Sequence, residues 1–313
     1  MTQTAHKIQA FTGATQSTKS EYKGASKEQF VSELALGSRV DSVFVMSHSE
    51  SRIAQNGSRY LTYMLHDRTG QIRGIEFDRT SFGDVPPVNT VVHVVGIVEG
   101  IRKRKHIKIS AIQATSAYEA RDFLTQSLRP ISEMSQEFGS RVKSLKDLSY
   151  KRLIKEVFYF DATYKKFIEA PLSEKGLYAY QGAALEKSLK ACSIIDALCE
   201  LYPQARKNLL IAAALLHYVG SVDAFRVDAL IAPTERGRNL GVKTLSVHKI
   251  ENAWSRYPLL ERTATAVETV ILGSADEQSS LALEVSLFSQ IEALIERADS
   301  AQSQDFARGV VGL

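Results

Sequence analysis

The sequence contains one histidine in a setting that could hold a metal ion. His217 ends an apolar run of helical character, and Tyr218 follows it directly. A carboxylate in that second position would complete a ligand pair, because divalent cations such as Mg²⁺ prefer charged oxygen donors. A phenol with an unperturbed pKa of about 10 is neutral at pH 7 and supplies little charge to a cation. We therefore interpret His217 as a buried structural residue, unless another side chain has replaced the missing ligand.

The neighbouring carboxylates do not form a recognisable replacement site. Four of them could contribute, but their spacing matches no compact ligand motif; they are Asp223, Asp228, Asp276 and Glu277. We expect no cofactor. Mn²⁺ or Mg²⁺ is the alternative if the site has been rewired.

A second group of residues combines positive charge with aromatic rings. Arg59, Tyr60, Arg73 and Phe77 lie in or beside two short β-rich runs. Arginine pairs with phosphate and aromatic rings stack on bases, so the combination suits a single-stranded nucleic acid. The alternative is that the rings only fill or cover a hydrophobic core. Their grouping with arginines favours binding.

The most concentrated positive charge lies in residues 102–108. Five of these seven residues are cationic, namely Arg102, Lys103, Arg104, Lys105 and Lys108. Taken alone, such a run is a solvated hairpin tip. Beside the aromatic group, it would contact several phosphates and make binding strongly dependent on salt. We favour phosphate contact.

The elements that must position these residues differ between the two halves of the chain. Short β-rich runs separated by turn signals indicate a five-stranded barrel in the first half; the expected strands are residues 41–46, 60–66, 72–78, 91–98 and 107–112. Strand alternation places Leu61, Tyr63 and Leu65 on one face, which packs the barrel. The opposite face, which carries Tyr60, is then available to bases.

The second half consists of long amphipathic segments with prolines at the gaps between them. This pattern predicts an all-α domain; the expected helices are residues 144–159, 164–170, 182–200, 207–218, 240–256, 259–272 and 281–298. A chain of 313 residues also exceeds the length at which one core stops growing. Two domains, a β-barrel followed by a helical domain, are therefore expected.

We place the domain boundaries where the composition changes. The expected order is a flexible N-terminal tail, the barrel, a connector, the helical domain and a C-terminal tail, over residues 1–36, 37–115, 116–143, 144–300 and 301–313. Residues 1–115 hold 15 lysines and arginines against 10 acidic residues, whereas the rest of the chain is nearly balanced at 24 against 25. The positive excess of the N-terminal part is expected if that part meets a polyanion.

Composition gives no sign of a membrane segment or a secretory signal. The longest aliphatic run, Leu209–Leu216, is far shorter than the roughly 20 residues that span a bilayer. The first 27 residues are polar and contain no apolar core of a signal peptide. Cys192 and Cys199 fit small buried apolar positions on one helix. We expect a cytoplasmic protein without a membrane partner.

Several segments resemble a known family. Asn56–Gly74 resembles the segment from strand 2 to strand 3 in OB-folds that bind single-stranded nucleic acid, and residues 102–108 match the strand 4–5 loop that borders their groove. Short motifs then recur in the second half at Tyr178–Lys187, Leu201–Pro203, Asn208–Leu210, Leu215–Gly220 and Arg238–Gly241. Over about residues 37–300, the chain is similar to the YhaM-type 3′-to-5′ exoribonucleases. The resemblance implies an OB-fold followed by an HD phosphohydrolase domain.

The departures from the family pattern fall on its metal ligands. Only His217 is clearly retained; the other ligand positions correspond to Lys187, Tyr218, Val242, Ser274, Ala275 and Glu292. An ammonium, a valine and an alanine offer no lone pair to a cation. The resemblance therefore implies a degenerate HD domain without a metal, in which Lys187 provides a fixed positive charge.

Three functions are compatible with these observations. We favour a catalytically inactive protein that binds single-stranded RNA or DNA through the barrel and uses the helical domain as a scaffold, an oligomerisation surface or a docking site. The second is an active, metal-dependent 3′-to-5′ exonuclease with unusual ligands. The third is an adaptor whose barrel binds a protein, since fold does not fix function. A homo-oligomer, and a protein partner at the helical domain or the N-terminal tail, are further expectations.

Overall fold

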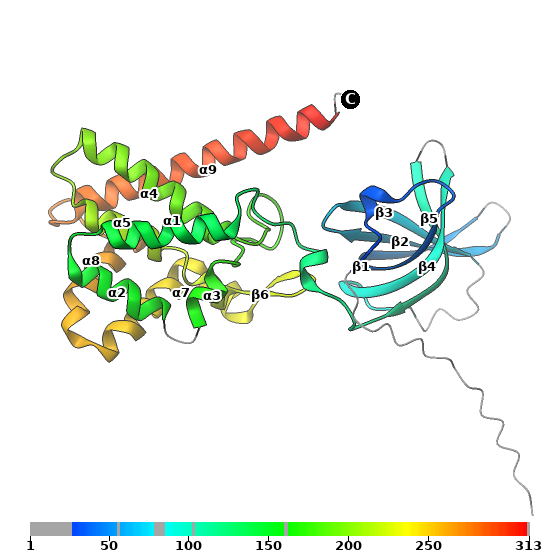
Figure 1. Ribbon diagram of the computed structural model, residues 1–313, viewed down its shortest axis with the longest axis horizontal. Helices are drawn as coiled ribbons and strands as arrows, with labels where there is room; N and C mark the ends of the chain where they lie inside the picture. The colour runs from blue at the N-terminus through cyan, green and yellow to red at the C-terminus, as the bar shows by residue number, and fades with distance from the viewer. Residues whose placement is uncertain (1–26, 55–56, 78–84, 102–103, 160–161, 312–313) are drawn as a thin grey trace, which may run out of the picture.

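The chain folds into a β-barrel and a body of helices that lie at opposite ends of an elongated molecule (Figure 1). A computed structural model describes residues 27–54, 57–77, 85–101, 104–159 and 162–311. The predicted fold class, a five-stranded barrel with OB-fold strand order followed by a helical domain, is confirmed.

Five strands close the barrel in the order β1-β2-β3-β5-β4. They are β1 (Arg39–Ile53), β2 (Arg59–Asp67), β3 (Gly70–Phe77), β4 (Thr90–Ile101) and β5 (Arg104–Ala114). The pair β3 and β5 is parallel and the other neighbouring pairs are antiparallel. Leu61, Tyr63 and Leu65 are buried in the barrel core, so the predicted interior face of β2 is confirmed.

Residues 27–36 belong to the barrel, and the prediction of a flexible tail is wrong for this part. They include a short 3-10 helix, η1 (Val31–Glu33), that packs against one end of the barrel. Leu34 is buried in the barrel core, and the amide of Val31 donates to Asp67 Oδ2 at 2.9 Å. We call residues 27–36 the strap. The apolar residues of the strap stabilise the barrel, because they cover part of its core that would otherwise face water.

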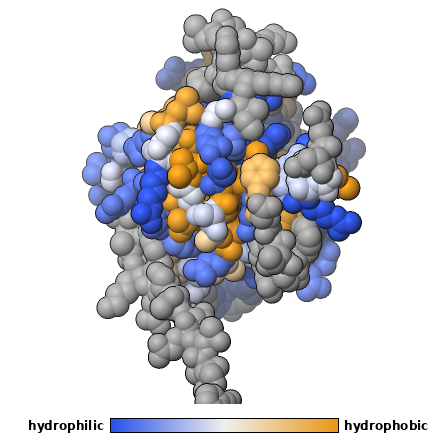
Figure 2. Space-filling view, turned by 90° about the vertical axis from the view of Figure 1, so that its right-hand side faces the viewer, coloured by the Kyte–Doolittle hydropathy of each residue, from blue (hydrophilic) through white to orange (hydrophobic). Residues whose placement is uncertain are grey.

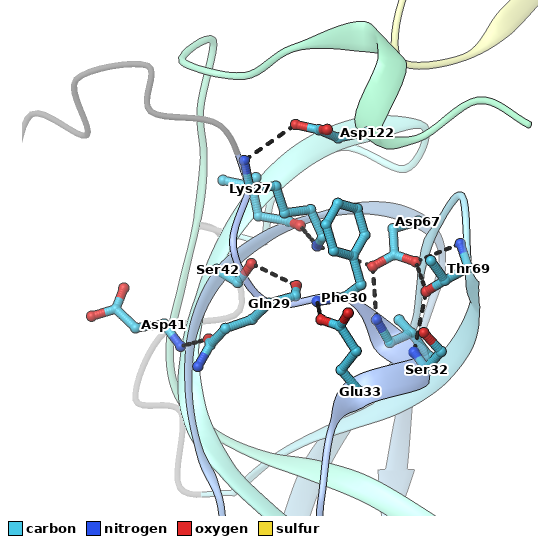
Figure 3. A network of polar contacts seen from close by, with 12 residues as sticks. Lys27, Gln29, Phe30, Ser32, Glu33, Asp41, Ser42, Asp67, Thr69 and Asp122 are labelled. Atoms are coloured by element: carbon cyan, nitrogen blue, oxygen red, sulfur yellow. Dashed lines mark hydrogen bonds and ion pairs between the residues drawn. The ribbon is translucent and has the colours of Figure 1, made fainter.

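Lys27 anchors the strap by inserting its side chain into the barrel (Figure 3). Its Nζ lies 3.2 Å from Asp67 Oδ2, and neither side chain is exposed to solvent. The ammonium also lies 3.6 Å from the centre of the Phe44 ring and donates to the carbonyl of Val43. The backbone amide of Lys27 donates to Asp122 Oδ2 at 3.3 Å. One lysine thus connects the strap to β1, to the end of β2 and to the chain after the barrel.

Burial lowers the pKa of Lys27 to about 8, against the opposing attraction of Asp67 and Asp122. Below pH 8 both the folded and the unfolded chain hold the proton. From pH 8 to about 10.5 the unfolded chain holds it and the folded chain does not, so folding stability rises with pH. We expect wild type to gain about 2 kcal/mol over Lys27→Met between pH 8 and pH 10. Pulse proteolysis in urea, followed by mass spectrometry of barrel peptides, measures this difference; parallel pH profiles would contradict it.

The helical domain is built around α5 (Lys207–Leu216), in which every residue from Leu209 to Leu216 is buried. A helix that is apolar on all sides must be surrounded by other elements. These are α1 (Ile131–Ser144), α2 (Leu148–Phe158), α3 (Thr163–Phe167), α4 (Ala183–Leu201), α6 (Ser221–Ala224), α7 (Glu235–Arg256), α8 (Glu261–Leu272) and α9 (Ala282–Val311). Of the helices in the described ranges, none has the length and apolar character needed to cross a membrane.

Three predicted features of the second half need correction. The connector predicted at 116–143 contains α1, whose Met134 and Phe138 are buried in the helical core. The tail predicted at 301–313 is helical as far as Val311, because α9 continues without a break. The domain also contains a hairpin of β6 (Phe225–Val227) and β7 (Ile231–Pro233), which are too short to show strand alternation in the sequence.

This hairpin joins the two domains (Figure 1). Ala229 and Leu230 at its turn pack with Val43 and Val91 of the barrel and with Phe123 of the chain between the domains. The hydroxyl of Tyr118 donates to Asp228 Oδ2 at 3.0 Å beside this apolar cluster. The contact covers part of the outer surface of β1 and β4. In the part of the chain that the structure describes, this apolar cluster includes no residue of β2, β3 or β5, so the outer surface of these strands is separate from the contact.

Candidate functional site

The outer surface of β2 and β3 carries a pair of aromatic rings. Tyr60 and Phe77 are directly opposite in the antiparallel register, and their ring centres lie 5.6 Å apart with planes inclined by 31°. Residues directly opposite in a sheet share a face, so both rings point outward together. Phe77 is 42% exposed, which is unusual for so apolar a side chain. The pair forms a platform on which a flat ligand can stack.

Positive charges share this face with the rings. Arg52 of β1 lies opposite Tyr60, and Arg73 of β3 lies opposite Met64, four residues further along β2. Lys108 of β5 lies opposite Ile75 in the parallel pair, between the positions of Arg73 and Phe77. The register therefore brings cations from three strands around one aromatic pair. We call Arg52, Tyr60, Arg73, Phe77 and Lys108 the barrel face.

Two of these cations are held by weak surface ion pairs. Arg52 lies 2.8 Å from Glu50 and Lys108 lies 3.4 Å from Glu99, with all four side chains about half exposed. Exposed ion pairs contribute only about 0–1 kcal/mol. A phosphate can displace the carboxylates at small cost, so the cations are available to a polyanion.

Figure 2 shows the end of the molecule that the barrel forms, where a band of hydrophobic residues is bordered by hydrophilic ones. The barrel's exposed large apolar side chains include Leu36, Ile53, Phe77 and Ile97. Ile97 lies opposite Lys108 on β4 and so adjoins the barrel face. Exposed apolar surface beside cations is typical of sites that contact both the bases and the backbone of a strand.

The structure separates the predicted binding residues into three groups. Tyr60, Arg73, Phe77 and Lys108 share the barrel face, and Arg104 shares it by strand alternation at the start of β5. Lys105 points to the other side, where its Nζ donates to the carbonyl of Leu34 at 2.8 Å. Arg59 is exposed but, by alternation, lies on the interior side of β2 at its rim. Arg102 and Lys103 lie outside the described residues.

Sequence patterns missed Arg52. We expected β1 to end at Met46, because the residues from Ser47 to Arg52 are polar and show no apolar alternation. In the structure β1 continues to Ile53 and pairs with β2 over its whole second half. Arg52 and Tyr60 are eight residues apart, and the sequence would have predicted that they lie opposite each other only if the strands on either side of residues 54–58 had been assumed to form a long hairpin.

The helical domain has a polar cavity of about 400 Å³ at the position of the expected HD centre. His217 Nε2 lies 3.3 Å from Glu292 Oε2, and the Tyr218 hydroxyl donates to the same oxygen. Burial, with smaller contributions from Lys243 and Lys187, lowers the pKa of His217 to about 3. Burial also raises the pKa of Glu292. The histidine is therefore neutral at pH 7.

Lys187 projects into this cavity from α4 and is only 4% exposed. Its Nζ donates to Glu296 Oε1 at 3.2 Å. The ammonium also lies 4.7 Å from the centre of the Tyr178 ring and 5.1 Å from that of Tyr218, distances typical of cation–π contacts. A carboxylate and two rings therefore surround the charge of Lys187.

These residues do not fit a divalent cation. His217 Nδ1 and Glu292 Oε1 are buried without a hydrogen-bond partner among the described atoms, so two donors are available. Two donors fall short of the set that such an ion takes, and the ammonium of Lys187 repels it. Across the described ranges, no group of three or more His, Cys, Asp or Glu side chains could hold a metal. Asp223 is paired with Lys249 at 3.1 Å, and Asp228 accepts from Tyr118.

Comparison with known proteins confirms the predicted resemblance. No family model matches the chain. The 3′-5′ exoribonuclease YhaM of Bacillus subtilis (strain 168) is 26% identical over 222 residues, which is 70% of each chain. The protein of that name from Listeria monocytogenes serotype 4b (strain F2365) is 22% identical over 233 residues, or 71% of this chain and 72% of the relative.

Solved structures match this chain only at low overall similarity. A domain of replication protein A from Methanococcus maripaludis is 18% identical, covers 28% of this chain and 92% of its own, and has a TM-score of 0.25.

Proposed function

We propose that this protein binds single-stranded nucleic acid across the barrel face. The observation that carries the proposal is the Tyr60–Phe77 pair, in which Phe77 is exposed and Tyr60 partly exposed, with cations from three strands set around it by the strand register. Stacking of a base on an aromatic side chain is worth about 1–3 kcal/mol and tolerates any sequence. The surrounding cations bind the phosphates between the stacked bases. The similarity to relatives named as exoribonucleases supports a nucleic-acid ligand.

The same proposal assigns the helical domain a non-catalytic role as a scaffold. A metal-activated water needs a cation that lowers its pKa. Lys187, Tyr218 and Val242 line the cavity where such a cation would be held, and none of them is a suitable ligand for it. An active exonuclease with a rewired site is the competing function, and the next experiment separates the two.

The test uses a 5′-labelled single-stranded RNA and the DNA of the same sequence, incubated with the full chain in EDTA, Mg²⁺ or Mn²⁺. Gel retention and strand length are followed in the same samples. Strands that are retained and keep their full length in all three conditions are the expected result. A metal-dependent ladder that His217→Ala abolishes would replace this proposal by an active nuclease. If the protein retains neither the RNA nor the DNA strand, the proposal that the barrel binds nucleic acid is wrong.

The phosphate contacts predict a change in salt dependence. For single strands, each cation that neutralises a phosphate contributes about 0.7 to the slope of log affinity against log salt concentration. We expect Arg73→Gln and Lys108→Gln each to lower the slope by about that amount, and the double variant by about twice as much. Fluorescence anisotropy from 50 to 300 mM salt measures the slopes. Lys165→Gln, an exposed cation of α3, serves as the control and is expected to leave the slope unchanged.

A further inference from the structure

Three helices bring a set of polar groups together at one cavity of the helical domain. Lys187 comes from α4, His217 and Tyr218 from the end of α5, and Glu292 and Glu296 from α9. All five line the same cavity. Lys187, His217 and Tyr218 are buried and Glu292 is partly buried, whereas Glu296 is exposed. Burying polar groups is costly unless each charge has a partner. The arrangement of these partners therefore indicates what stabilises the centre of the domain.

The acidic residues of α9 form one line along the helix. Glu292, Glu296 and Asp299 are spaced by four and three residues, which places them on the same face. Glu292 contacts His217 and Tyr218, and Glu296 contacts Lys187. Asp299 lies 3.1 Å from Lys190 Nζ and accepts from the hydroxyl of Tyr178, also at 3.1 Å. Each acid thus connects α9 to α4, to the segment before α4 or to the end of α5.

Lys187 of α4 lies opposite the middle of this line of acidic residues. Its Nζ lies above the ring of Tyr218, whose hydroxyl donates to Glu292. It also bonds Glu296 one turn further along α9. The side chain is buried, whereas Lys190 on the next turn of α4 is more than one third exposed. Lys243 also lines the cavity but is exposed, so Lys187 is the buried cation beside the partly buried Glu292 and the exposed Glu296.

We infer that the ammonium group of Lys187 takes the structural place that a divalent ion would hold between α4, α5 and α9. An ammonium carries one positive charge and three donors, so it can bond the carboxylate of Glu296 while its remaining surface faces the rings of Tyr178 and Tyr218. A divalent ion entering the same cavity would meet this charge at close range. The domain is accordingly stable without metal.

The first experiment measures whether the wild-type chain responds to metal. Trp254, the single tryptophan, packs against the helical core and reports unfolding of this domain by fluorescence. We expect the same Tm in 1 mM EDTA, 1 mM Mn²⁺ and 1 mM Mg²⁺. A ligand that binds only the folded state raises Tm. An increase of several degrees in Mn²⁺ that occurs in the wild-type chain and is absent in His217→Ala would therefore overturn the inference.

The second experiment restores donors to the cavity. In the variant Lys187→His/Tyr218→Asp the internal cation is replaced by an imidazole and a carboxylate is added beside His217. We expect its Tm to rise in 1 mM Mn²⁺ by roughly 5 °C, while wild type and Lys190→Met show no change. If the double variant fails to fold, Lys187→His alone replaces it. The same Mn²⁺ response in Lys190→Met would contradict a special role for Lys187.

The third measurement removes the charge without adding a donor. Lys187→Met keeps the length of the side chain, and we expect its Tm in EDTA to fall by roughly 5 °C, because the acids of α9 lose their buried counter-charge. Lys190→Met removes a more exposed cation and is expected to fall by less than half of that. Equal stability of Lys187→Met and wild type would show that the ammonium has no structural role. Retention of a labelled single strand by Lys187→Met confirms that the barrel is intact.

Discussion

Single-strand affinity is expected to fall by about two orders of magnitude when Tyr60 and Phe77 are both replaced by alanine. The two rings form one stacking platform on the barrel face, with centres 5.6 Å apart. Each base that stacks on an aromatic ring contributes about 1–3 kcal/mol, so loss of two rings removes about 2–6 kcal/mol of binding free energy, and a hundredfold loss of affinity, about 2.8 kcal/mol, lies within this range. The measurement is the Kd for a labelled 15-nucleotide strand by fluorescence anisotropy, at one fixed salt concentration.

The control is Tyr159→Ala, which removes an aromatic ring that is 80% exposed on the helical domain. It is expected to leave Kd unchanged. Tyr60 lies near the start of β2 and Phe77 is the last residue of β3, so both belong to strands that close the barrel. Circular dichroism and thermal melting must therefore show that the double variant keeps its barrel. Unchanged affinity in a folded double variant would place the binding surface elsewhere. Loss of affinity in Tyr159→Ala alone would move it to the helical domain.

The barrel face shows which part of a site local patterns can predict. Alternation along β2 identified Leu61, Tyr63 and Leu65 as interior residues, and it therefore also identified the outward direction of Tyr60. Arg73, Phe77 and Lys108 were predicted as individual residues, because aromatic and cationic types are informative by themselves. Their mutual arrangement depends on the register between β2, β3 and β5. Register is set by contacts distant in sequence, which one strand does not reveal.

The strap illustrates a different limit. Half of its residues are polar and it follows a polar N-terminal segment, so composition assigned it to a flexible tail. Lys27 becomes an anchor only because Asp67, forty positions later, supplies the opposite charge inside the barrel. A lysine is almost never fully buried without such a partner. Long-range pairing of this kind leaves no periodic signal near either residue, and the same holds for Lys187 and its partner Glu296 on α9.

The predicted HD centre was the part of the site where the sequence was most informative about what is missing. The resemblance identified Lys187 as standing at a ligand position, and the chemistry of the Lys187 and Tyr218 side chains makes both of them poor ligands. The resemblance placed Glu292 at a ligand position, but the partners of Lys187 were not predictable, because the orientation of the acidic face of α9 follows from its packing on α4 and α5. The structure places Glu292 and Glu296 toward the cavity. Residue type therefore predicts what a site lacks more readily than what replaces it.

Replacing Asp67 by asparagine is expected to destabilise the barrel by about 3 kcal/mol at pH 7, because it leaves the charge of Lys27 buried without its partner. Asparagine has nearly the same shape, and its carbonyl oxygen can still accept from the amide of Val31 or Thr69, which both donate to Asp67 in the wild type. The loss therefore reports mainly the ion pair. Pulse proteolysis in urea, read on barrel peptides, gives the free energy of unfolding.

The pH dependence of this loss distinguishes a buried charge from a general packing defect. Lys27 has a pKa of about 8 in the folded protein, so at pH 10 it is neutral and no longer needs a counter-charge. The cost of Asp67→Asn should therefore be markedly smaller at pH 10 than at pH 7, since only hydrogen bonds worth about 1 kcal/mol remain affected. Glu99→Gln disrupts an exposed pair with Lys108 and should cost less than about 1 kcal/mol at both pH values. An equal cost of Asp67→Asn at pH 7 and pH 10 would mean that Asp67 acts through its hydrogen bonds to the strap, and that the ammonium of Lys27 is not what makes the strap part of the barrel.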